Sequence, residues 1–259
     1  MYMLIFTGTM PNERSILMSV ENTLKQITVN LHSSIRIGGE TVIYVDPIGI
    51  SDAPHDADLV LITHPHFDHF SPRDIKKVMK DNTVIACPKA SAALCRLLTG
   101  KKPVTVSPGQ SLSLCGVPVE TVAAYNKNKP MHAKFFRFVG YVLTMDDTRV
   151  YISGDTDYTP EASAVQCDIA MIPIGGTYTM NPVQAASLVN QIAPKAVIPV
   201  HYGLALGGQD APETFRAHLQ PGIQADIRPT VYSKVMLRVL PLLLAAAVVL
   251  IFLVLRMIR

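Results

Sequence analysis

Three imidazoles and a carboxylate form a cluster directly after an apolar run at residues 57–62. The run predicts a buried strand, so the cluster lies at a strand's end. Its members are His64, His66, Asp68 and His69. Side chains at every second position of an extended backbone point the same way, so the first three converge, and the fourth needs only a turn to reach a neighbouring position.

Imidazole and carboxylate groups are ligands that zinc, manganese or iron accept when no thiolate is offered. The layout therefore suits two metal ions. The alternative is a histidine-rich surface turn, but imidazoles this close repel one another when protonated and gain nothing from sharing a loop.

The segment resembles the H-x-H-x-D-H signature of the metallo-β-lactamase superfamily, and three further stretches agree with that resemblance. Residues 151–157 (YISGDTD) are similar to the second acidic motif, and residues 197–203 (VIPVHYG) to the last motif. Residues 27–47 (ITVNLHSSIRIGGETVIYVDP) resemble the opening strands of the branch that includes ascorbate-6-phosphate lactonases and N-acyl-phosphatidylethanolamine phospholipase D. The resemblance covers roughly residues 20–233.

The resemblance implies a ligand set for two divalent ions, with zinc expected and manganese or iron as alternatives. His64 and His66 would hold one ion, and Asp155 would bridge both. The other ion would be held by Asp68, which is also the expected catalytic residue, together with His69 and His201. Asp46 ends a predicted strand before Pro47; the family places an aspartate here beneath the metals, where it orients a ligating histidine, and the alternative is a turn residue.

One ligand of the first ion departs from the family pattern. Where many relatives have a third histidine after an alanine–aromatic pair, this chain has Asn126 after Ala124-Tyr125. Asparagine is a poor zinc ligand, so a nitrogen from elsewhere is expected. His132 is the only histidine between Ala124 and Tyr141. We predict that it completes the site; the alternative is an exposed His132 with Asn126 contacting the metal or its water.

Two tyrosines are candidates for substrate binding. Tyr178 lies in a loop after an apolar strand, and Tyr202 directly follows His201. The alternative for the loop at residues 175–179 is a simple connection to a helix capped by Asn181.

Helix and strand signals alternate along the rest of the domain. A hairpin of two strands joined by Gly38-Gly39 is expected within residues 27–46. Helices are expected from Ser71 to about Lys80 and over residues 91–99 and 182–192. Further strands are expected at residues 83–86, 104–107, 111–114, 117–124, 134–142, 149–152, 168–174 and 196–200. The order predicts an α/β protein with two sheets and outer helices, the αββα four-layer sandwich that the resemblance implies.

The 259 residues are long enough for one large domain. Four cysteines without a C-x-x-C pattern give no sign of a disulfide framework. The net charge of +3 depends on four basic residues in the last 26, which hold no acid; the remainder has 19 basic and 20 acidic residues. No basic patch indicates nucleic-acid binding.

The two ends of the chain differ from the middle. Residues 1–19 are expected to be an N-terminal extension and not a signal peptide, because the apolar run at residues 3–6 is short and no basic residue precedes it. Residues 20–233 form the expected hydrolase domain. Residues 234–259 are expected to form a membrane anchor, since residues 239–255 are 17 uncharged, almost wholly apolar residues between Arg238 and Arg256. As a helix they would span about 25 Å.

The predicted function is a metal-dependent hydrolase in which a metal-activated water attacks an ester, lactone or phosphodiester bond of a small-molecule or lipid substrate. Without a signal peptide, the catalytic domain is expected in the cytoplasm, with a single C-terminal transmembrane helix. The competing prediction is a membrane-tethered metal-binding or sensing module with a catalytically silent site. The oligomeric state stays open.

Overall fold

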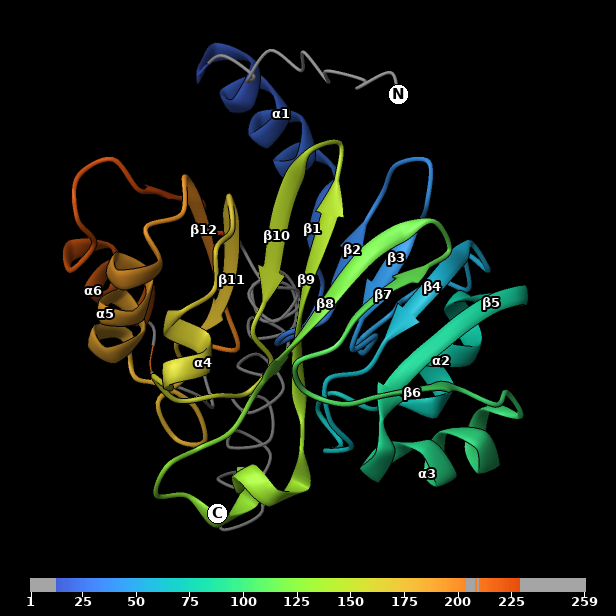
Figure 1. Ribbon diagram of the computed structural model, residues 1–259. Coiled ribbons are helices and arrows are strands. Elements are labelled where there is room, and N and C mark those ends of the chain that lie inside the picture. Colours follow the sequence, from blue (N-terminus) through green and yellow to red (C-terminus); the bar gives the residue numbers. More distant parts are fainter. Residues whose placement is uncertain (1–12, 204–207, 209, 229–259) are drawn as a thin grey trace, which may run out of the picture.

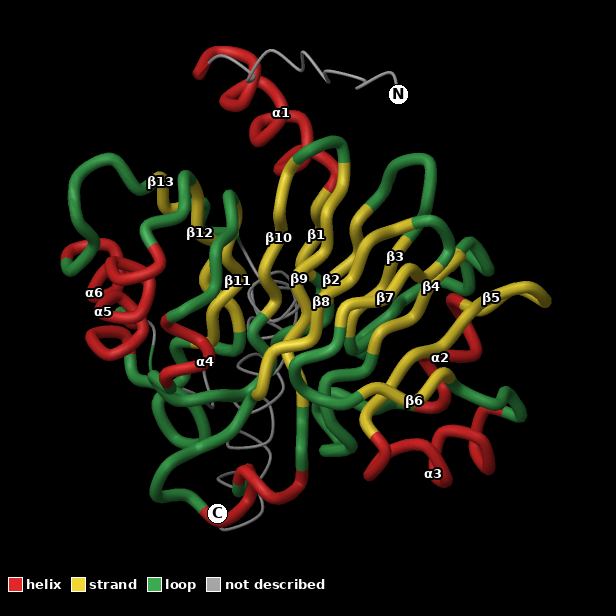
Figure 2. The backbone as a smooth tube through the Cα atoms, viewed as in Figure 1, coloured by secondary structure: helices red, strands yellow, loops and turns green. Residues whose placement is uncertain are grey.

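The computed structural model describes residues 13–203, 208 and 210–228. Two mixed sheets pack face to face, and helices cover their outer faces (Figures 1 and 2). The predicted α/β sandwich is thereby confirmed. The arrangement follows from strands that are apolar on both sides, because each sheet needs a second layer on either face.

The first sheet has the strand order β1-β2-β3-β4-β5-β6. The first three strands are antiparallel neighbours, and β3 to β6 run parallel. Its strands are β1 (Ile27–Val29), β2 (Ile35–Ile37), β3 (Ile43–Val45), β4 (Ala57–Leu61), β5 (Met79–Pro88) and β6 (Val104–Val106).

The second sheet has the order β13-β12-β11-β10-β9-β8-β7. β7 to β10 form an antiparallel meander, and β10 to β13 are parallel. Its strands are β7 (Ser111–Leu114), β8 (Val117–Ala123), β9 (Val139–Met145), β10 (Thr148–Ile152), β11 (Ile169–Pro173), β12 (Ala196–Val200) and β13 (Gln224–Ala225).

The helices lie mostly outside the sheets, with α2 and α3 beside the first sheet and α4, α5 and α6 beside the second (Figure 1). They are α1 (Glu13–Gln26), α2 (Pro72–Val78), α3 (Lys89–Thr99), α4 (Pro160–Ser163), α5 (Pro182–Ile192) and α6 (Ala211–Ala217), with two 3-10 turns, η1 (Pro130–His132) and η2 (Lys134–Phe136). As predicted, Ser71 caps α2 and Asn181 caps α5; Gly100 ends α3 in a left-handed conformation.

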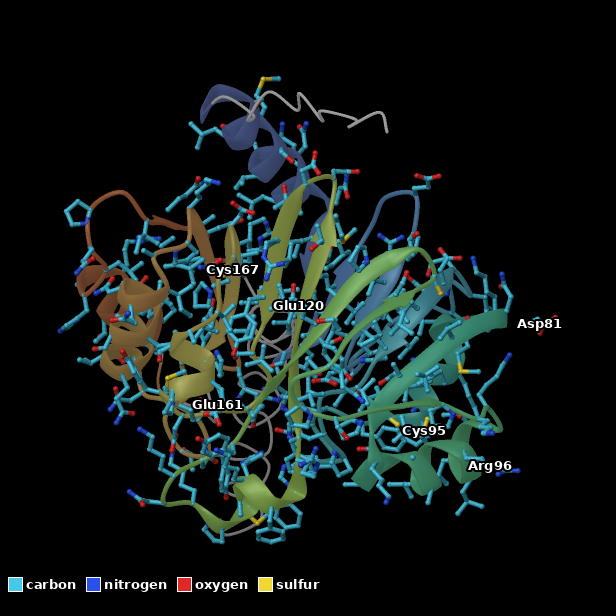
Figure 3. The ribbon with its side chains drawn as sticks, in the orientation of Figure 1. Asp81, Cys95, Arg96, Glu120, Glu161 and Cys167 are labelled. Atoms are coloured by element: carbon cyan, nitrogen blue, oxygen red, sulfur yellow. The ribbon has the colours of Figure 1, made fainter. Side chains whose placement is uncertain are left out.

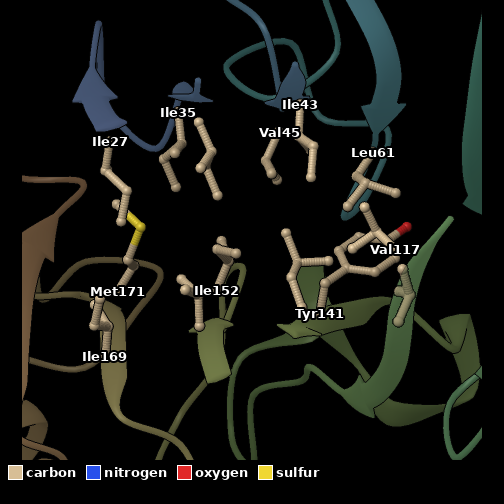
Figure 4. Close-up of a cluster of buried hydrophobic side chains, with 14 of the residues drawn as sticks. Ile27, Ile35, Ile43, Val45, Leu61, Val117, Tyr141, Ile152, Ile169 and Met171 are labelled. Atoms are coloured by element: carbon tan, nitrogen blue, oxygen red, sulfur yellow. The ribbon is translucent and has the colours of Figure 1, made fainter. Parts of the chain in front are cut away.

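The largest core lies between the two sheets, where every second residue of the strands points toward the other sheet. Figure 4 shows Ile35, Ile43 and Leu61 of the first sheet facing Tyr141 and Ile152 of the second. The intervening strand residues point outward and pack against the helices, forming one cluster under α5 and α6 and another under α2. These three apolar layers fix the position of the two sheets relative to each other and to the helices.

Several details differ from the prediction. The helix predicted to about Lys80 ends at Val78, because β5 begins at Met79. Residues 27–46 contain three strands, because a turn closed by hydrogen bonds between Asn30 or Leu31 and Ser34 interrupts the first run. Residues 134–138 are not strand, because Arg137 adopts a left-handed φ of 57° after η2, so β9 begins only at Val139. α1 runs continuously from Glu13 to Gln26, across the boundary expected at residues 19 and 20.

No helix among the described residues is long and apolar enough to span a membrane. The predicted anchor at residues 234–259 lies outside the described part of the chain.

Candidate metal centre

The candidate ligands gather where strands of both sheets end. Asp46 directly follows β3, and His64 follows β4 after two residues. In the other sheet, Asp155 follows β10 and His201 directly follows β12. The carboxyl ends of parallel strands open at one edge of a sheet, and here both sheets open at the same edge.

The first group of ligand atoms is His64, His66 and His132, with one ring nitrogen of each within 4.8 Å of the others. The Nε2 atoms of His64 and His132 are 3.3 Å apart, and both residues are buried. The structure thus brings His132, on η1, to the position where the sequence left the third ligand open.

The second group is Asp68, His69 and His201, whose ligand atoms also lie within 4.8 Å of one another. The Nε2 of His201 is 3.2 Å from Asp68 Oδ2, and the Nε2 of His69 is 3.9 Å from the same oxygen. These side chains come from the turn before α2 and from the end of β12, more than 130 residues apart along the chain.

Asp155 lies between the two groups. Its Oδ1 is 3.3 Å from His69 Nε2, and its Oδ2 is 3.5 Å from His201 Nε2 and 3.6 Å from His132 Nε2. One carboxylate therefore faces nitrogens of both groups, which is the geometry expected of a ligand shared by two ions.

Asp46 supports this cluster from below. Its Oδ1 accepts a hydrogen bond from the Thr63 amide at 2.8 Å. Its Oδ2 accepts from the Thr63 hydroxyl at 2.5 Å and from His69 Nδ1 at 2.8 Å. Asp46, His64 and His69 also form a compact group, but the Asp46 oxygens are already occupied by these donors. The contact fixes the tautomer of His69 and directs its Nε2 toward Asp155.

His132 has a similar support. Its Nδ1 lies 3.0 Å from Asn126 Oδ1, and the Asn126 amide donates to Asp157 Oδ1 at 3.0 Å. The Asn126 backbone N–H also donates to the His132 carbonyl at 2.8 Å. Asn126 thus contacts the imidazole and leaves Nε2 as the nitrogen that faces the cluster.

The backbone is strained at two of these positions. His201 has a φ of 55° and Asp46 a φ of 46°, both in the left-handed region. For residues with a Cβ this conformation costs roughly 1–2 kcal/mol each. Such strain concentrates where side chains have to be held in a working geometry.

The charges of the cluster are strongly coupled. Burial raises the pKa of Asp155, but His201 and His69 more than offset it and hold that pKa well below its usual range. Burial lowers the pKa of His69, yet Asp155 and Asp46 raise it well above its usual range. Burial lowers the pKa of His132 to about 4 and that of His64 well below its ordinary value. The first group is therefore neutral imidazole at neutral pH, the form that binds metals.

Two buried atoms without hydrogen-bond partners also indicate that the site suits metal ions. His69 Nε2 and Asp155 Oδ1 are buried and have no hydrogen-bond partner among the described residues, although they are 3.3 Å apart. A buried imidazole nitrogen and a carboxylate oxygen held this close together suit a cation between them. Three nitrogens on one side, two nitrogens and a carboxylate on the other, and a shared carboxylate supply a ligand set for two ions.

The two tyrosines predicted to bind substrate lie in different surroundings. Tyr202 packs against the apolar layer between the second sheet and its helices, and its hydroxyl donates to the Arg228 carbonyl at 3.0 Å, so the structure does not bring it to the ligand cluster. Tyr178 is half exposed in the loop before α5. Lys129 donates to carbonyls on either side of it, Gly176 and Thr179, which ties this loop to the one that carries His132.

Sequence reasoning missed three supporting residues. Thr63 links Asp46 to His64, because its hydroxyl lies 2.9 Å from His64 Nδ1. Asp157 holds Asn126 in place, and Phe138 packs against the ring of His64 at 5.3 Å between centroids. Thr63 and Asp157 stand beside recognisable motifs, which was the available signal, whereas Phe138 had none.

A family model for a beta-lactamase superfamily domain matches residues 26–201, more than half of the chain. The UPF0173 metal-dependent hydrolase Ta0764 of Thermoplasma acidophilum is 30% identical over 200 residues, covering 72% of this chain and 87% of that protein. A UPF0173 metal-dependent hydrolase of Methanocorpusculum labreanum is 31% identical over 186 residues, covering 68% and 82%.

Solved structures also resemble this chain. A protein from Parabacteroides distasonis, assigned as a metal-dependent hydrolase, matches with a TM-score of 0.68 and 32% identity over 78% of this chain and 91% of that one. The metallo hydrolase Igni18 of Ignicoccus hospitalis shares the fold, with a TM-score of 0.64 and 20% identity over 78% and 94%. The chain therefore belongs to the metallo-β-lactamase superfamily and, within it, to the UPF0173 metal-dependent hydrolase family.

Proposed function

We propose that this protein is a hydrolase that works with two divalent metal ions. His64, His66 and His132 would hold one ion, the group of Asp68, His69 and His201 the other, and Asp155 both. The observation that carries the proposal is the position of Asp155, whose two oxygens lie within 3.6 Å of nitrogens from both groups. The names of its relatives, metal-dependent hydrolases, support the same class of enzyme.

Two bound ions would supply an activated water at neutral pH and polarise the oxygen of the scissile bond. The chain's own residues hold this chemistry in place. Asp46 and Asn126 orient the rings of His69 and His132, and the buried setting strengthens every charge interaction at the centre. Asp68 is only partly buried, so of the acidic ligands it lies nearest to solvent and is our candidate to exchange protons with the substrate.

The substrate class we propose is an ester, a lactone or a phosphodiester. The support is the resemblance of the opening strands to the branch of ascorbate-6-phosphate lactonases and N-acyl-phosphatidylethanolamine phospholipase D. Zinc is the proposed metal because the set is rich in imidazole, and manganese or iron would accept the same ligands. Tyr178, on the loop tied to Lys129, is the proposed substrate contact.

The test combines elemental analysis with hydrolysis assays on lactones, bis-p-nitrophenyl phosphate and phospholipids. We expect turnover of one of these classes, its loss with a chelator, and its recovery on adding zinc, manganese or iron. Full metal occupancy without turnover of any of them would contradict the hydrolase and favour the catalytically silent binding module.

We also propose that residues 239–255 anchor the chain in a membrane, with the catalytic domain in the cytoplasm. The support is their sequence: 17 uncharged residues between Arg238 and Arg256, whose long side chains can reach the head groups. Full-length protein should need detergent, and protein ending at Ser233 should be soluble and active. Full-length protein that stays in solution without detergent would refute the anchor.

A further inference from the structure

Aromatic rings form a continuous chain of contacts from the metal centre to the surface. Phe138 is buried and lies 5.3 Å from the ring of His64 and 6.1 Å from that of His132, between centroids. Phe136 stacks on Phe138 at 5.3 Å, and Phe135 contacts Phe136 at 4.2 Å. The segment that positions His132 thus also carries apolar rings outward.

The outer members of this region are exposed to solvent. Phe135 is 75% exposed and Met131, next to His132, is 51% exposed. Phe67, next to His66, is 87% exposed. A single exposed apolar side chain is ordinary. Here Phe67 and Met131 adjoin two ligands whose rings lie 4.6 Å apart, and Phe135 ends the chain of rings that begins at Phe138, so the three lie around one centre.

The same segment is basic. Residues 127–137 contain Lys127, Lys129, Lys134 and Arg137 and no acidic residue. Lys129 pairs with Asp157 at 3.4 Å, and Lys134 pairs at 2.6 Å with Glu161, the residue of α4 labelled in Figure 3. The other two are exposed and form no ion pair within the part of the chain that the structure describes.

We propose that residues 127–137, together with Phe67, dock onto a lipid surface that carries anionic head groups. Exposed aromatic and apolar side chains flanked by lysine and arginine have the composition of a membrane-surface segment. The segment projects beyond the ends of β8 and β9, at the bottom of Figure 1. Docking there would hold the mouth of the metal centre against the bilayer, so that an amphiphilic substrate reaches it from the lipid phase.

A second copy of the chain is a poorer occupant of this surface. A symmetric dimer would place the same segment against itself, bringing Lys127 and Arg137 of both copies together. Anionic head groups attract the same charges. The inference on substrate delivery rests on the proposed hydrolase activity, whereas the docking itself does not, and it is separate from the proposed C-terminal anchor.

The chain has no tryptophan, so Phe135→Trp introduces a single reporter. The full-length variant is reconstituted with phosphatidylcholine vesicles, with and without phosphatidylglycerol, in which a fraction of the lipid is brominated to quench tryptophan at acyl-chain depth. Leu97→Trp is the matched control, because Leu97 is 78% exposed on α3, away from the metal centre. Flotation of the vesicles reports attachment of the chain by any route.

We expect the tryptophan of Phe135→Trp to be quenched and its emission shifted to shorter wavelength on anionic vesicles, and that of Leu97→Trp to be unaffected. Adding Lys127→Glu and Arg137→Glu should lower the ratio of docked to undocked segment by about 30-fold or more, since each basic residue near an anionic surface contributes about 5-fold. If the segment docks but the protein does not hydrolyse lipid, the docking stands, and only the delivery of substrate from the lipid phase is rejected.

Three results would overturn the docking. A Phe135→Trp reporter that is not quenched although the chain floats would mean that attachment is by the C-terminal segment alone. A blue shift that depends on protein concentration and not on lipid would assign the surface to a second copy. A blue shift in dilute protein without lipid, unchanged by brominated lipid, would mean that another part of the same chain covers position 135.

Discussion

Replacing Asp46 by asparagine should weaken metal binding while leaving the fold intact. The carboxylate accepts three hydrogen bonds, two from Thr63 and one from His69 Nδ1. Asparagine has the same shape but only one accepting oxygen. In one orientation its NH₂ group faces the Thr63 N–H. In the other it faces His69 Nδ1, which then has to lose its proton, so that Nε2 carries a proton where a metal would bind.

The magnitude follows from these contacts. One buried donor left without an acceptor costs about 1–3 kcal/mol of stability, less than the roughly 5–15 kcal/mol that holds an ordinary domain together. The loss of a residue that orients a metal ligand lowers affinity by about 10- to 100-fold, which corresponds to roughly 1.4–2.8 kcal/mol. The variant should therefore fold and bind metal poorly.

The assay is competitive titration of zinc against a chromophoric chelator, with urea unfolding of the same samples. Asp74→Asn is the control, because Asp74 is a mostly buried carboxylate that accepts from Gly49 N and lies on α2 outside the ligand groups. It should lose stability but keep its metals. Equal metal affinities of Asp46→Asn and the wild type would refute the orienting role of Asp46.

Two further pairs of substitutions test the support of His132 and the packing at Gly140. His132→Ala should weaken metal binding more than Asn126→Ala, which should cost about 10-fold, because the first removes a ligand and the second its support; the reverse order in chelator titrations would make Asn126 the ligand. Gly140→Ala should lower the free energy of unfolding by about 3 kcal/mol in urea, since its Cβ would lie 2.6 Å from the Ser153 carbonyl oxygen. A Cβ at Gly116 would have no heavy atom of another described residue within 4 Å apart from its chain neighbours, so Gly116→Ala should cost about 1–2 kcal/mol through its φ of 81° alone; equal losses would contradict the steric reasoning.

Much of the fold could be predicted because local signals and burial agree. Strands such as β4, β11 and β12 are apolar on both faces, and the caps at Ser71 and Asn181 stand where the sequence predicts helix starts. The positions of the ligands at strand ends could be predicted for the same reason, because the end of a strand fixes where the next few residues lie. The convergence of Asp155 and His201 came from the family resemblance and from topology, not from local pattern.

What could not be predicted depends on backbone conformations that leave no periodic signal. Phe135 and Phe136 have strand propensity, yet the left-handed Arg137 turns this segment out of the sheet. Phe138, directly after that turn, contacts the ring of His64, and Asn126 supports His132; neither contact is visible in residue spacing. Tyr202 directly follows His201 in the sequence, but the left-handed φ of 55° at His201 turns the chain after β12, and the Tyr202 side chain packs against the apolar cluster under α5 and α6.

The shared role of Asp155 is tested by the metal content of Asp155→Ala beside that of the wild type, measured by elemental analysis after desalting. A carboxylate shared by two ions should be needed by both, so the wild type should retain two ions per chain and the variant one or none, with hydrolysis lost. Its thermal unfolding without added metal should stay cooperative, which separates loss of metal from loss of fold. Retention of two ions per chain in Asp155→Ala would contradict the shared-ligand assignment.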